Sequence, residues 1–394
     1  MTDPFHTASA EEIQKGHVAE ASLALAREIL MAERSNPAVV AEVRASALPP
    51  AWPWGVFAGL EEALELLRGS AVRLEALPEG SVFYAEEPVL TVAGPYQEFG
   101  MLETSLLGLL SAASGVATSA ARFKRAARGR PVYSLGSARV HPAIVPMVER
   151  AAFIGGCDGV STPKAGELVG REPVATMPHA AVLLLGEERA WLALDRSLDR
   201  KVPRVVLVDT IQDEKTGVMA AARALRDRLS AVRVDGPPSR RGNLVGILRE
   251  IRWELDTRGF TKVQLFVSGD LDEADIAQLN RHADSYGIAS AIATAPAVAF
   301  DLDLVEVDGR PRSRRGKLSG RKHLWVCPEC GNRGIAPWAA RLGHCPRCGH
   351  RVRSLPETWM ADGKRRRGSP SADDVRQHCL SEVGAAPDPF VRRE

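Results

Sequence analysis

The sequence predicts an α/β protein with an irregular α/β barrel of about seven strands, a split, sandwich-like N-terminal α/β module and a small C-terminal zinc knuckle. Three observations lead to this prediction. Short β-forming segments alternate with helical segments from about residue 130 to residue 293, which is typical of parallel strands with helices outside them. The first hundred residues mix helical spacing with strand-like alternation. Two Cys-x-x-Cys pairs lie between residues 327 and 348.

These changes of pattern predict the domain boundaries. We expect an N-terminal module over 1–115 that is completed by 295–325, a barrel over 116–294, a zinc knuckle over 326–352 and a polar tail over 353–394. Within the first module, spacing predicts helices over 20–34 and 60–67, and alternation predicts strands within 81–94. A long Ala- and Leu-rich helix over 96–129 is expected to join the module to the barrel.

Seven segments within the barrel region have the composition of strands. They are 131–135, 157–161, 173–176, 204–208, 231–234, 262–267 and 288–292, and helices are expected over 214–229, 241–258 and 272–286. An open doubly wound sheet is the alternative architecture. However, no glycine-rich dinucleotide fingerprint follows the first of these strands, and SRRGKLSG lacks the spacing of a P-loop.

Composition and charge limit the class of protein. The chain has 394 residues, more than one ordinary core holds, and 51 Lys and Arg against 49 Asp and Glu give a net charge of only +2. This balance argues against a nucleic-acid partner. No apolar run approaches the roughly 20 residues of a membrane helix, and the N-terminus lacks the pattern of a secretory signal. We therefore expect a cytoplasmic protein with no membrane partner.

Polar residues follow several of the predicted strands, where barrel enzymes place their active sites. These residues are Ser137, Arg139, Ser161, Thr162, Asp209, Thr210, Asp235, Ser268, Gly269 and Asp270. Any one of them could instead be an ordinary helix N-cap, since Asp, Ser and Thr are the usual caps. Because all of them are expected at the carboxyl edge of the strands, the set as a whole favours an active site there.

The chemistry of that edge suggests a phosphorylated sugar as its ligand. Positive charge comes from Arg139, Lys164, Arg233, Arg240 and Arg241. Ser268 and Gly269 precede a predicted helix, whose N-terminal N–H groups suit a phosphate. Asp209 and Asp235 could hold ribose hydroxyls or a Mg²⁺ bound to diphosphate. His179, in ATMPHA, is either a capping residue or a carrier of protons or phosphoryl groups.

The two cysteine pairs give the most specific spacing. Cys327, Cys330, Cys345 and Cys348 are expected to bind one tetrahedral Zn²⁺. Four sulfur ligands close the coordination sphere, so we expect a structural metal, with His344 and His350 as bystanders. A nucleic-acid or protein-binding role for this knuckle and for the GKRRRG run at 363–368 is the less favoured reading.

Several ordered blocks together resemble archaeal-type nicotinate phosphoribosyltransferases over roughly residues 10 to 350. The blocks are GPYQEFGMLETSLLGLLSAASGVATSAARFKRAA, GSARVHPAIVPMVERAAFIGGCDGVS, ATMPHA, VVLVDTIQDE, AVRVDGPPSRRGN, FVSGDLDEADI and RGKLSGRK. The resemblance implies an enzyme of NAD salvage that joins nicotinate to 5-phosphoribosyl 1-diphosphate, giving nicotinate mononucleotide and diphosphate. It also implies coupling to ATP through a phosphohistidine, and a homo-oligomer in which a second subunit completes the site.

The resemblance also assigns roles to individual residues. Thr176 matches a nicotinate-contacting Thr, His179 the phosphorylated His, and Arg233 the Arg that binds the carboxylate. The remaining matches are Asp209 and Asp235 near ribose and metal, Arg139 among the substrate-binding residues, and Ser268, Gly269 and Ser290 at the phosphate.

Four positions depart from the family pattern as we read it. They are Ser22, Ala138, Asp270 and Ala289, where Tyr, Arg, Gly and Gly are expected. The alternative hypothesis is therefore a diverged paralogue with another substrate or no catalytic activity.

Overall fold

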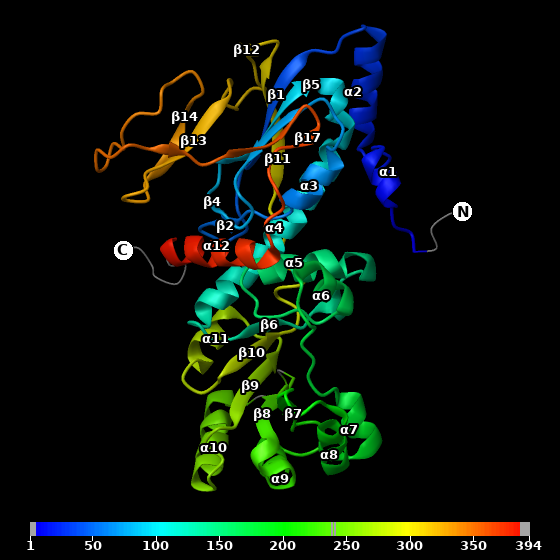
Figure 1. Ribbon diagram of the computed structural model, residues 1–394, viewed down its shortest axis with the longest axis vertical. Coiled ribbons are helices and arrows are strands. Elements are labelled where there is room, and N and C mark those ends of the chain that lie inside the picture. The colour runs from blue at the N-terminus through cyan, green and yellow to red at the C-terminus, as the bar shows by residue number, and fades with distance from the viewer. Residues whose placement is uncertain (1–4, 238, 240–241, 387–394) are drawn as a thin grey trace. The chain divides into compact units, whose positions relative to one another are not determined.

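The computed structural model describes residues 5–237, 239 and 242–386, and it consists of two compact units (Figure 1). The first unit combines both ends of the chain, up to Thr118 and from Pro296 onward, and the second spans Ser119–Ala295. The boundary falls within the long helix α4 (Glu103–Ala126).

The first unit is built on a seven-stranded antiparallel sheet. Its strand order is β12 (Arg310–Pro311), β11 (Phe300–Val307), β1 (Ala38–Ala45), β5 (Pro88–Pro95), β3 (Arg73–Ala76), β16 (Glu357–Ala361) and β17 (Lys364–Arg365). The chain thus returns to this sheet after the second unit, because β11 pairs with β1. Smaller elements are α1 (Ala10–Gln14), α2 (Ala21–Ala32), and the pair β2 (Gly55–Val56) and β4 (Val82–Phe83).

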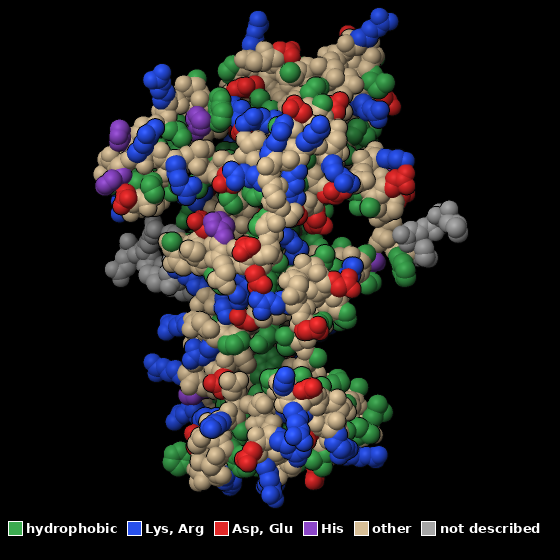
Figure 2. All heavy atoms as spheres, viewed as in Figure 1, with side chains coloured by type: hydrophobic (Ala, Val, Ile, Leu, Met, Phe, Trp, Pro, Cys, Tyr) green, Lys and Arg blue, Asp and Glu red, His purple; other side chains and the backbone are tan. Residues whose placement is uncertain are grey.

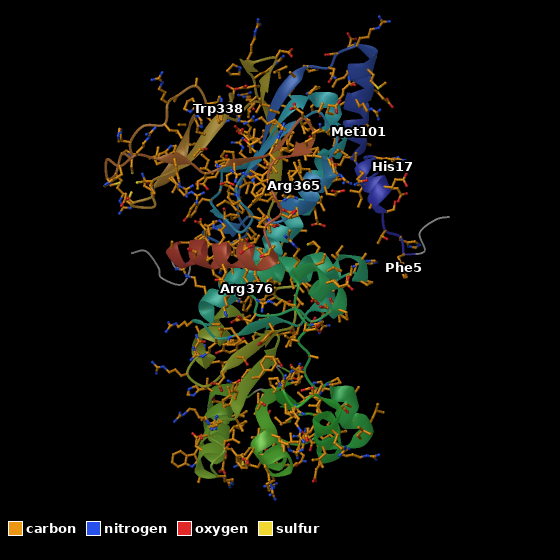
Figure 3. All side chains as sticks on the ribbon, viewed as in Figure 1. Phe5, His17, Met101, Trp338, Arg365 and Arg376 are labelled. Carbon is orange, nitrogen blue, oxygen red and sulfur yellow. The ribbon has the colours of Figure 1, made fainter. Side chains whose placement is uncertain are left out.

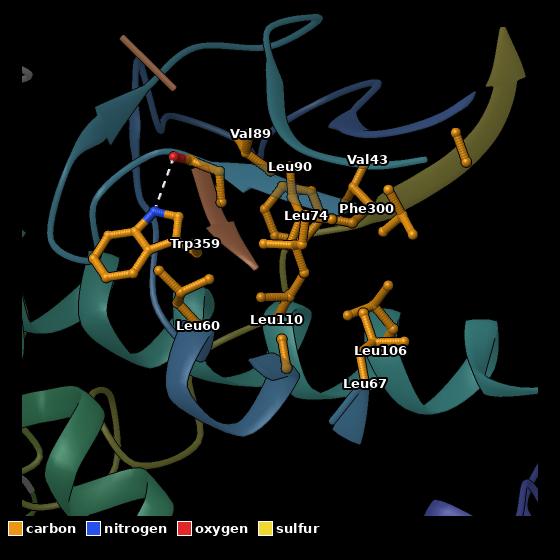
Figure 4. Packing of buried hydrophobic residues seen from close by; sticks show 14 of the residues in the cluster. Val43, Leu60, Leu67, Leu74, Val89, Leu90, Leu106, Leu110, Phe300 and Trp359 are labelled. Atoms are coloured by element: carbon orange, nitrogen blue, oxygen red, sulfur yellow. Dashed lines mark hydrogen bonds between the residues drawn. The ribbon is translucent and has the colours of Figure 1, made fainter. Parts of the chain in front are cut away.

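A buried apolar cluster joins this sheet to helix α3 (Leu60–Leu66) and to the first part of α4 (Figure 4). Leu74 and Phe300 from the sheet pack in the same cluster as Leu60 and Leu110 from the helices. Burying each such side chain contributes about 1.5–3 kcal/mol. Gly59 has a φ of +92°, and an added Cβ would lie 2.9 Å from the Leu109 carbonyl oxygen, so glycine lets α3 begin close to α4.

The segment expected to be a polar tail, 353–394, contains strands and a helix within its described residues, which end at 386. Trp359 of β16 is buried, and its indole nitrogen donates to the Ala76 carbonyl at 3.2 Å (Figure 4). Helix α12 (Ala372–Ala385) buries Val375 and Cys379. A few apolar residues at strand and helix spacing, within an otherwise charged segment, are enough to order it. Residues 387–394 lie outside the described part of the chain.

A three-stranded antiparallel ribbon carries the cysteine pairs. It consists of β13 (Lys322–Val326), β14 (Arg333–Pro337) and β15 (Arg353–Ser354), and Trp338 lies just after β14 (Figure 3). Ion pairs tie the ribbon to its own unit: Lys322 contacts Glu42 and Arg333 contacts Glu87, both at 2.8 Å. The GKRRRG run forms a hairpin in which Arg365 pairs with Glu61. Its basic charge is therefore partly neutralised within the molecule.

The second unit contains a five-stranded parallel sheet. Its strand order is β6 (Val132–Ser134), β10 (Ser285–Ile288), β9 (Gln264–Gly269), β8 (Leu229–Val234) and β7 (Arg204–Leu207). The accompanying helices are α5 (Val145–Ile154), α6 (Pro163–Val169), α7 (His179–Leu185), α8 (Glu187–Ser197), α9 (Glu214–Leu225), α10 (Leu244–Thr257) and α11 (Glu273–Leu279). Because all five strands run in one direction, their carboxyl ends meet at one edge.

Two of the seven predicted barrel segments are not regular strands, and a third is displaced. Segments 157–161 and 173–176 each donate one backbone hydrogen bond of the kind that joins neighbouring strands. These bonds run from Asp158 N to Val132 O and from Val174 N to Val160 O, and both are 2.8 Å long. The strand expected over 288–292 lies at Ser285–Ile288, where Tyr286 and Ile288 are buried. Across the described residues, hydrogen bonding gives an open five-stranded order rather than a closed barrel.

One described helical segment, Gly100–Ala126, is long and apolar enough to cross a membrane by length and composition. Of its most apolar window, 67% is buried within the protein, as is typical of a core helix.

Candidate active site

The candidate active site lies at the carboxyl ends of β7, β8 and β9. Asp209 and Thr210 follow β7, Arg233 and Asp235 lie at the end of β8, and Ser268 is near the end of β9. Local sequence explains this placement, because a run of buried apolar residues in each strand directly precedes these polar side chains. The runs are 206–208, 231–232 and 265–267.

Arg233 is the centre of the cluster. Its Nε donates to Ser268 Oγ at 2.8 Å and its Nη1 donates to Thr176 Oγ1 at 2.6 Å. Its Nη2 donates to Asp235 Oδ2, and Ser268 Oγ donates to Asp235 Oδ1 at 2.7 Å. With 14% of the side chain exposed, the guanidinium is held firmly at the rim of the sheet.

His179 reaches the same carboxylate from the first turn of α7. Its Nε2 lies 3.3 Å from Asp235 Oδ2, and its Nδ1 lies 3.0 Å from Thr210 Oγ1. The imidazole is 45% exposed, so it remains open to a ligand. The structure therefore places Arg233 and His179 at the same carboxylate oxygen, Asp235 Oδ2.

Asp209 contacts the main chain of this cluster. Its Oδ2 accepts a hydrogen bond from the Asp235 backbone N–H at 2.6 Å, and its Oδ1 is buried with no hydrogen-bond partner among the described residues. Burial raises the pKa of the Asp209 carboxyl, and the charge of Asp235 raises it further, while the Asp235 N–H and His179 act in the opposite direction. The unpartnered Oδ1 is a free oxygen ligand of the type that Mg²⁺ takes, so the residues present fit that ion.

Other predicted residues lie outside this cluster. Arg139 is exposed and makes no hydrogen bond or ion pair to the described members of the cluster. Ser290 instead donates to Asp270 Oδ1 at 2.9 Å. Gly269 has a φ of +125°, which only glycine adopts readily. Arg240 and Arg241 lie outside the described residues.

We expected the helix after Gly269 to present its N-terminus to a phosphate, but the N–H groups of that N-terminus are not all free. Helix α11 begins at Glu273, and the Asp272 carboxylate already accepts the Asp275 N–H at 2.8 Å. Glu273 and Asp275 add negative charge to the first turn. An anion near Gly269 would therefore depend on the loop and not on this helix.

Glu149 is a polar contact that the sequence reading did not single out. This buried carboxylate of α5 accepts hydrogen bonds from Ser161 N at 2.7 Å, Thr162 N at 3.1 Å and Ser161 Oγ at 2.7 Å, and Ser137 Oγ also donates to it. It thereby joins the segments that follow β6 and residues 157–160. Its signal in the sequence is the one acidic residue within the mostly apolar run VPMVERAAFI.

The four cysteines of the ribbon form a second candidate centre. Their Sγ atoms all lie within 4.8 Å of one another, with Cys327 and Cys348 3.4 Å apart and Cys330 and Cys345 3.6 Å apart. A tetrahedral zinc site with Zn–S bonds of about 2.3 Å has its sulfurs about 3.8 Å apart, so this arrangement fits a metal. Gly331 and Gly349 have positive φ in the turns after each pair.

Comparison with known proteins places the chain in a family. Models of the N-terminal and C-terminal domains of quinolinate phosphoribosyl transferase match residues 22–114 and 116–303. A nicotinate phosphoribosyltransferase of Mycobacterium tuberculosis is 33% identical over 332 residues, which cover 73% of this chain and 72% of that protein.

Solved structures give the same result. The nicotinate-nucleotide pyrophosphorylase from Pyrococcus furiosus superposes with a TM-score of 0.95 at 44% identity, covering 97% of this chain and 98% of that one. Human nicotinic acid phosphoribosyltransferase shares the fold, with a TM-score of 0.77 at 21% identity over 93% of each chain. The chain therefore belongs to the phosphoribosyltransferase family that contains these nicotinate and quinolinate enzymes.

Proposed function

We propose that this protein joins nicotinate to 5-phosphoribosyl 1-diphosphate, giving nicotinate mononucleotide and diphosphate in NAD salvage. The observation that carries the proposal is the Arg233 guanidinium, which three side chains hold at the carboxyl end of β8. The names of the relatives support nicotinate as the ring acid.

Arg233 has the donors that a ring carboxylate needs. A guanidinium has five N–H groups, and three of them are used by Ser268, Thr176 and Asp235. One N–H remains on each terminal nitrogen. This pair would bind a carboxylate through two parallel hydrogen bonds, whereas the NH₂ of the corresponding amide would leave one donor unmatched.

The acidic residues would act on the sugar diphosphate. Asp209 and Asp235 would hold ribose hydroxyls and a Mg²⁺, which when bound supplies positive charge for the departing diphosphate. Ser268, Gly269, Ser290 and Arg139 would contact phosphate groups. His179 would accept a phosphoryl group if the reaction is coupled to ATP, since its ring is exposed beside Asp235.

Further parts of the proposal concern the whole protein. The four-cysteine cluster would hold a structural Zn²⁺, because four thiolates leave no open coordination position. The enzyme would be cytoplasmic, where thiols stay reduced. It would form a homo-oligomer in which a second subunit completes the site.

The test is an assay of purified protein with nicotinate, 5-phosphoribosyl 1-diphosphate and Mg²⁺, with and without ATP, and with quinolinate or nicotinamide in place of nicotinate. We expect nicotinate mononucleotide to form, and Arg233→Lys to raise the KM for nicotinate roughly tenfold or more because the two-pronged contact is lost. Arg249→Lys, an exposed change on α10, serves as the control. No mononucleotide at any enzyme concentration would refute the proposal.

A specific contact supports the alternative of a diverged paralogue with another substrate or no activity. The Asp270 carboxylate accepts the Ser290 hydroxyl at 2.9 Å, so it lies on a group assigned to phosphate binding. Asp270→Gly, alone and combined with Ala289→Gly, Ala138→Arg and Ser22→Tyr, tests it. On this alternative the combined variant gains transferase activity that the natural chain lacks, and a natural chain already active with nicotinate excludes it.

A further inference from the structure

A cavity of about 770 Å³ lies at the amino ends of β7 and β8. Residues at the C-terminal end of α8, in the segment leading to β7, and at the start of β8 line it. Since the candidate active site is at the carboxyl ends of the same strands, this cavity opens at the opposite edge of the sheet. It is distinct from the candidate active site.

A buried arginine shapes the wall of the cavity. Arg204 donates from Nε to Asp195 Oδ1 at 2.9 Å, from Nη1 to the Asp199 carbonyl at 2.6 Å, and from Nη2 to the Leu198 carbonyl at 2.9 Å. Further bonds reach the Asp195 and Val202 carbonyls. The guanidinium therefore fixes the segment between α8 and β7 in one conformation, and the cavity is preformed.

The charge of the lining is strongly positive. Five cations, Arg196, Arg200, Lys201, Arg204 and Arg228, face two carboxylates, Asp195 and Asp227. Asp195 is buried and already shared by Arg204 and Arg228. Among the described residues, Arg196, Arg200 and Lys201 have no carboxylate partner. Figure 2 shows Lys and Arg outnumbering acidic side chains at this end of the second unit.

The rest of the lining excludes several kinds of ligand. It contains no aromatic side chain to stack on a ring, and its apolar members are only Leu198, Val202 and Pro203. A small ligand with several anionic oxygens matches unpaired guanidinium and ammonium groups better than an apolar ring does. The volume lies within the usual range of small-molecule sites.

We propose that this cavity binds an oligophosphate, either inorganic or the phosphate chain of a nucleoside triphosphate. Arg200, Lys201 and Arg196 supply the free cations, and Arg204 holds the main chain of the segment that carries Arg200 and Lys201. The bound phosphates lie at the amino ends of β7 and β8. This proposal does not depend on the transferase activity.

The test is isothermal titration of the full chain with inorganic triphosphate, at fixed ionic strength and without nicotinate or sugar diphosphate. Arg200→Glu combined with Lys201→Glu is expected to weaken binding at least about tenfold, since two attractive charges become repulsive. Arg249→Glu combined with Arg281→Glu changes the net charge equally at exposed positions outside the cavity, and is expected to bind within about twofold of the natural chain. Circular dichroism confirms that both variants are folded.

Two results would overturn the proposal. One is unchanged triphosphate binding in the Arg200 and Lys201 variant, which would place all binding elsewhere. The other is an equal loss in the control pair, which would indicate non-specific attraction. Parallel titrations with ATP and adenosine identify the source of the phosphates: ATP is expected to bind and adenosine is not, and adenosine binding that the cavity variant loses would contradict the assignment.

Discussion

Arg233 connects the candidate active site because side chains from three segments share its guanidinium. Thr176 comes from the segment before α7, Ser268 from β9 and Asp235 from the end of β8. Each of these residues also has an ordinary role as a hydrogen-bond partner. In the proposed transferase, these partners would orient Arg233 so that its two unused N–H groups meet the ring carboxylate.

Asp209 gives a prediction about pH. Because burial raises its carboxyl pKa, the folded state binds this proton more tightly than the unfolded chain does. The Asp209 contribution to stability is therefore present at low pH, and it is lost as the pH rises from near the ordinary Asp value, about 3.9, through the raised pKa. Asp209→Asn keeps an oxygen acceptor for the Asp235 N–H but cannot ionise. Relative to the natural protein, its free energy of unfolding should increase from pH 4 to pH 7, as measured by urea denaturation. A difference that is constant with pH would contradict the raised pKa.

The structure brings five of the candidate residues together: Thr176, His179, Arg233, Asp235 and Ser268. The alternating pattern locates the strand ends that carry Arg233, Asp235 and Ser268, whereas Thr176 and His179 come from the segment around the start of α7. The structure does not bring Arg139 or Ser290 to these residues, since motif order says nothing about where a loop side chain turns. The role of Glu149 was not foreseen, because its partners are residues 137, 161 and 162, and one acidic residue in a helix does not identify them.

At the scale of elements, Glu149 connects two loops, the one that follows β6 and the one that begins at Ser161. Glu149→Ala leaves two partly buried backbone N–H groups and two hydroxyls without this acceptor. It should reduce the free energy of unfolding by about 2–4 kcal/mol, and Glu149→Gln should cost less because one amide oxygen remains. Chemical denaturation monitored by fluorescence measures both changes. Equal costs for the two variants would show that the carboxylate contributes only through packing.

Helix α9 packs directly against the main chain at the end of β7. A Cβ on Gly217 would lie 1.9 Å from the Val208 carbonyl oxygen, directly before Asp209. Gly217→Ala should therefore push α9 away from the strand, destabilise the protein by about 1–3 kcal/mol and lower transferase activity as Asp209 moves. Gly108→Ala in α4 is a suitable control, because no atom lies within 4 Å of a Cβ added there. Gly186→Ala is not a suitable control, because that glycine has a φ of +80°, which strains any other residue. Activity and stability retained in Gly217→Ala would show that the helix can shift at no cost.

The elements that sequence patterns predicted well are those with a continuous buried run. The strands expected over 204–208, 231–234 and 262–267 correspond to β7, β8 and β9. The segments over 157–161 and 173–176 contain Gly, Asp and Pro, and they make only isolated ladder bonds. Local propensity could not distinguish these two cases, because both segments were short and partly apolar.

At the scale of the whole molecule, the four-cysteine cluster should bind one metal ion per chain. Cys345→Ser should remove the ion and lower the thermal midpoint, since folding of small thiolate sites is coupled to metal binding. Cys379→Ser alters a buried thiol outside the cluster and should retain the metal. Native mass spectrometry and elemental analysis count the ion. A metal-free natural chain of full stability would contradict a structural role.

The order in which the ribosome delivers the chain is not the order in which the first sheet can form. Residues 73–76 are translated before the second unit, yet their neighbour in the sheet, Glu357–Ala361, is translated only after it. The intervening unit, Ser119–Ala295, has its own parallel sheet and can be finished while β3 still has an unpaired edge. A nascent chain stalled before residue 357 would therefore expose that edge to other strands, and Glu357–Ala361 acts as its protective cover.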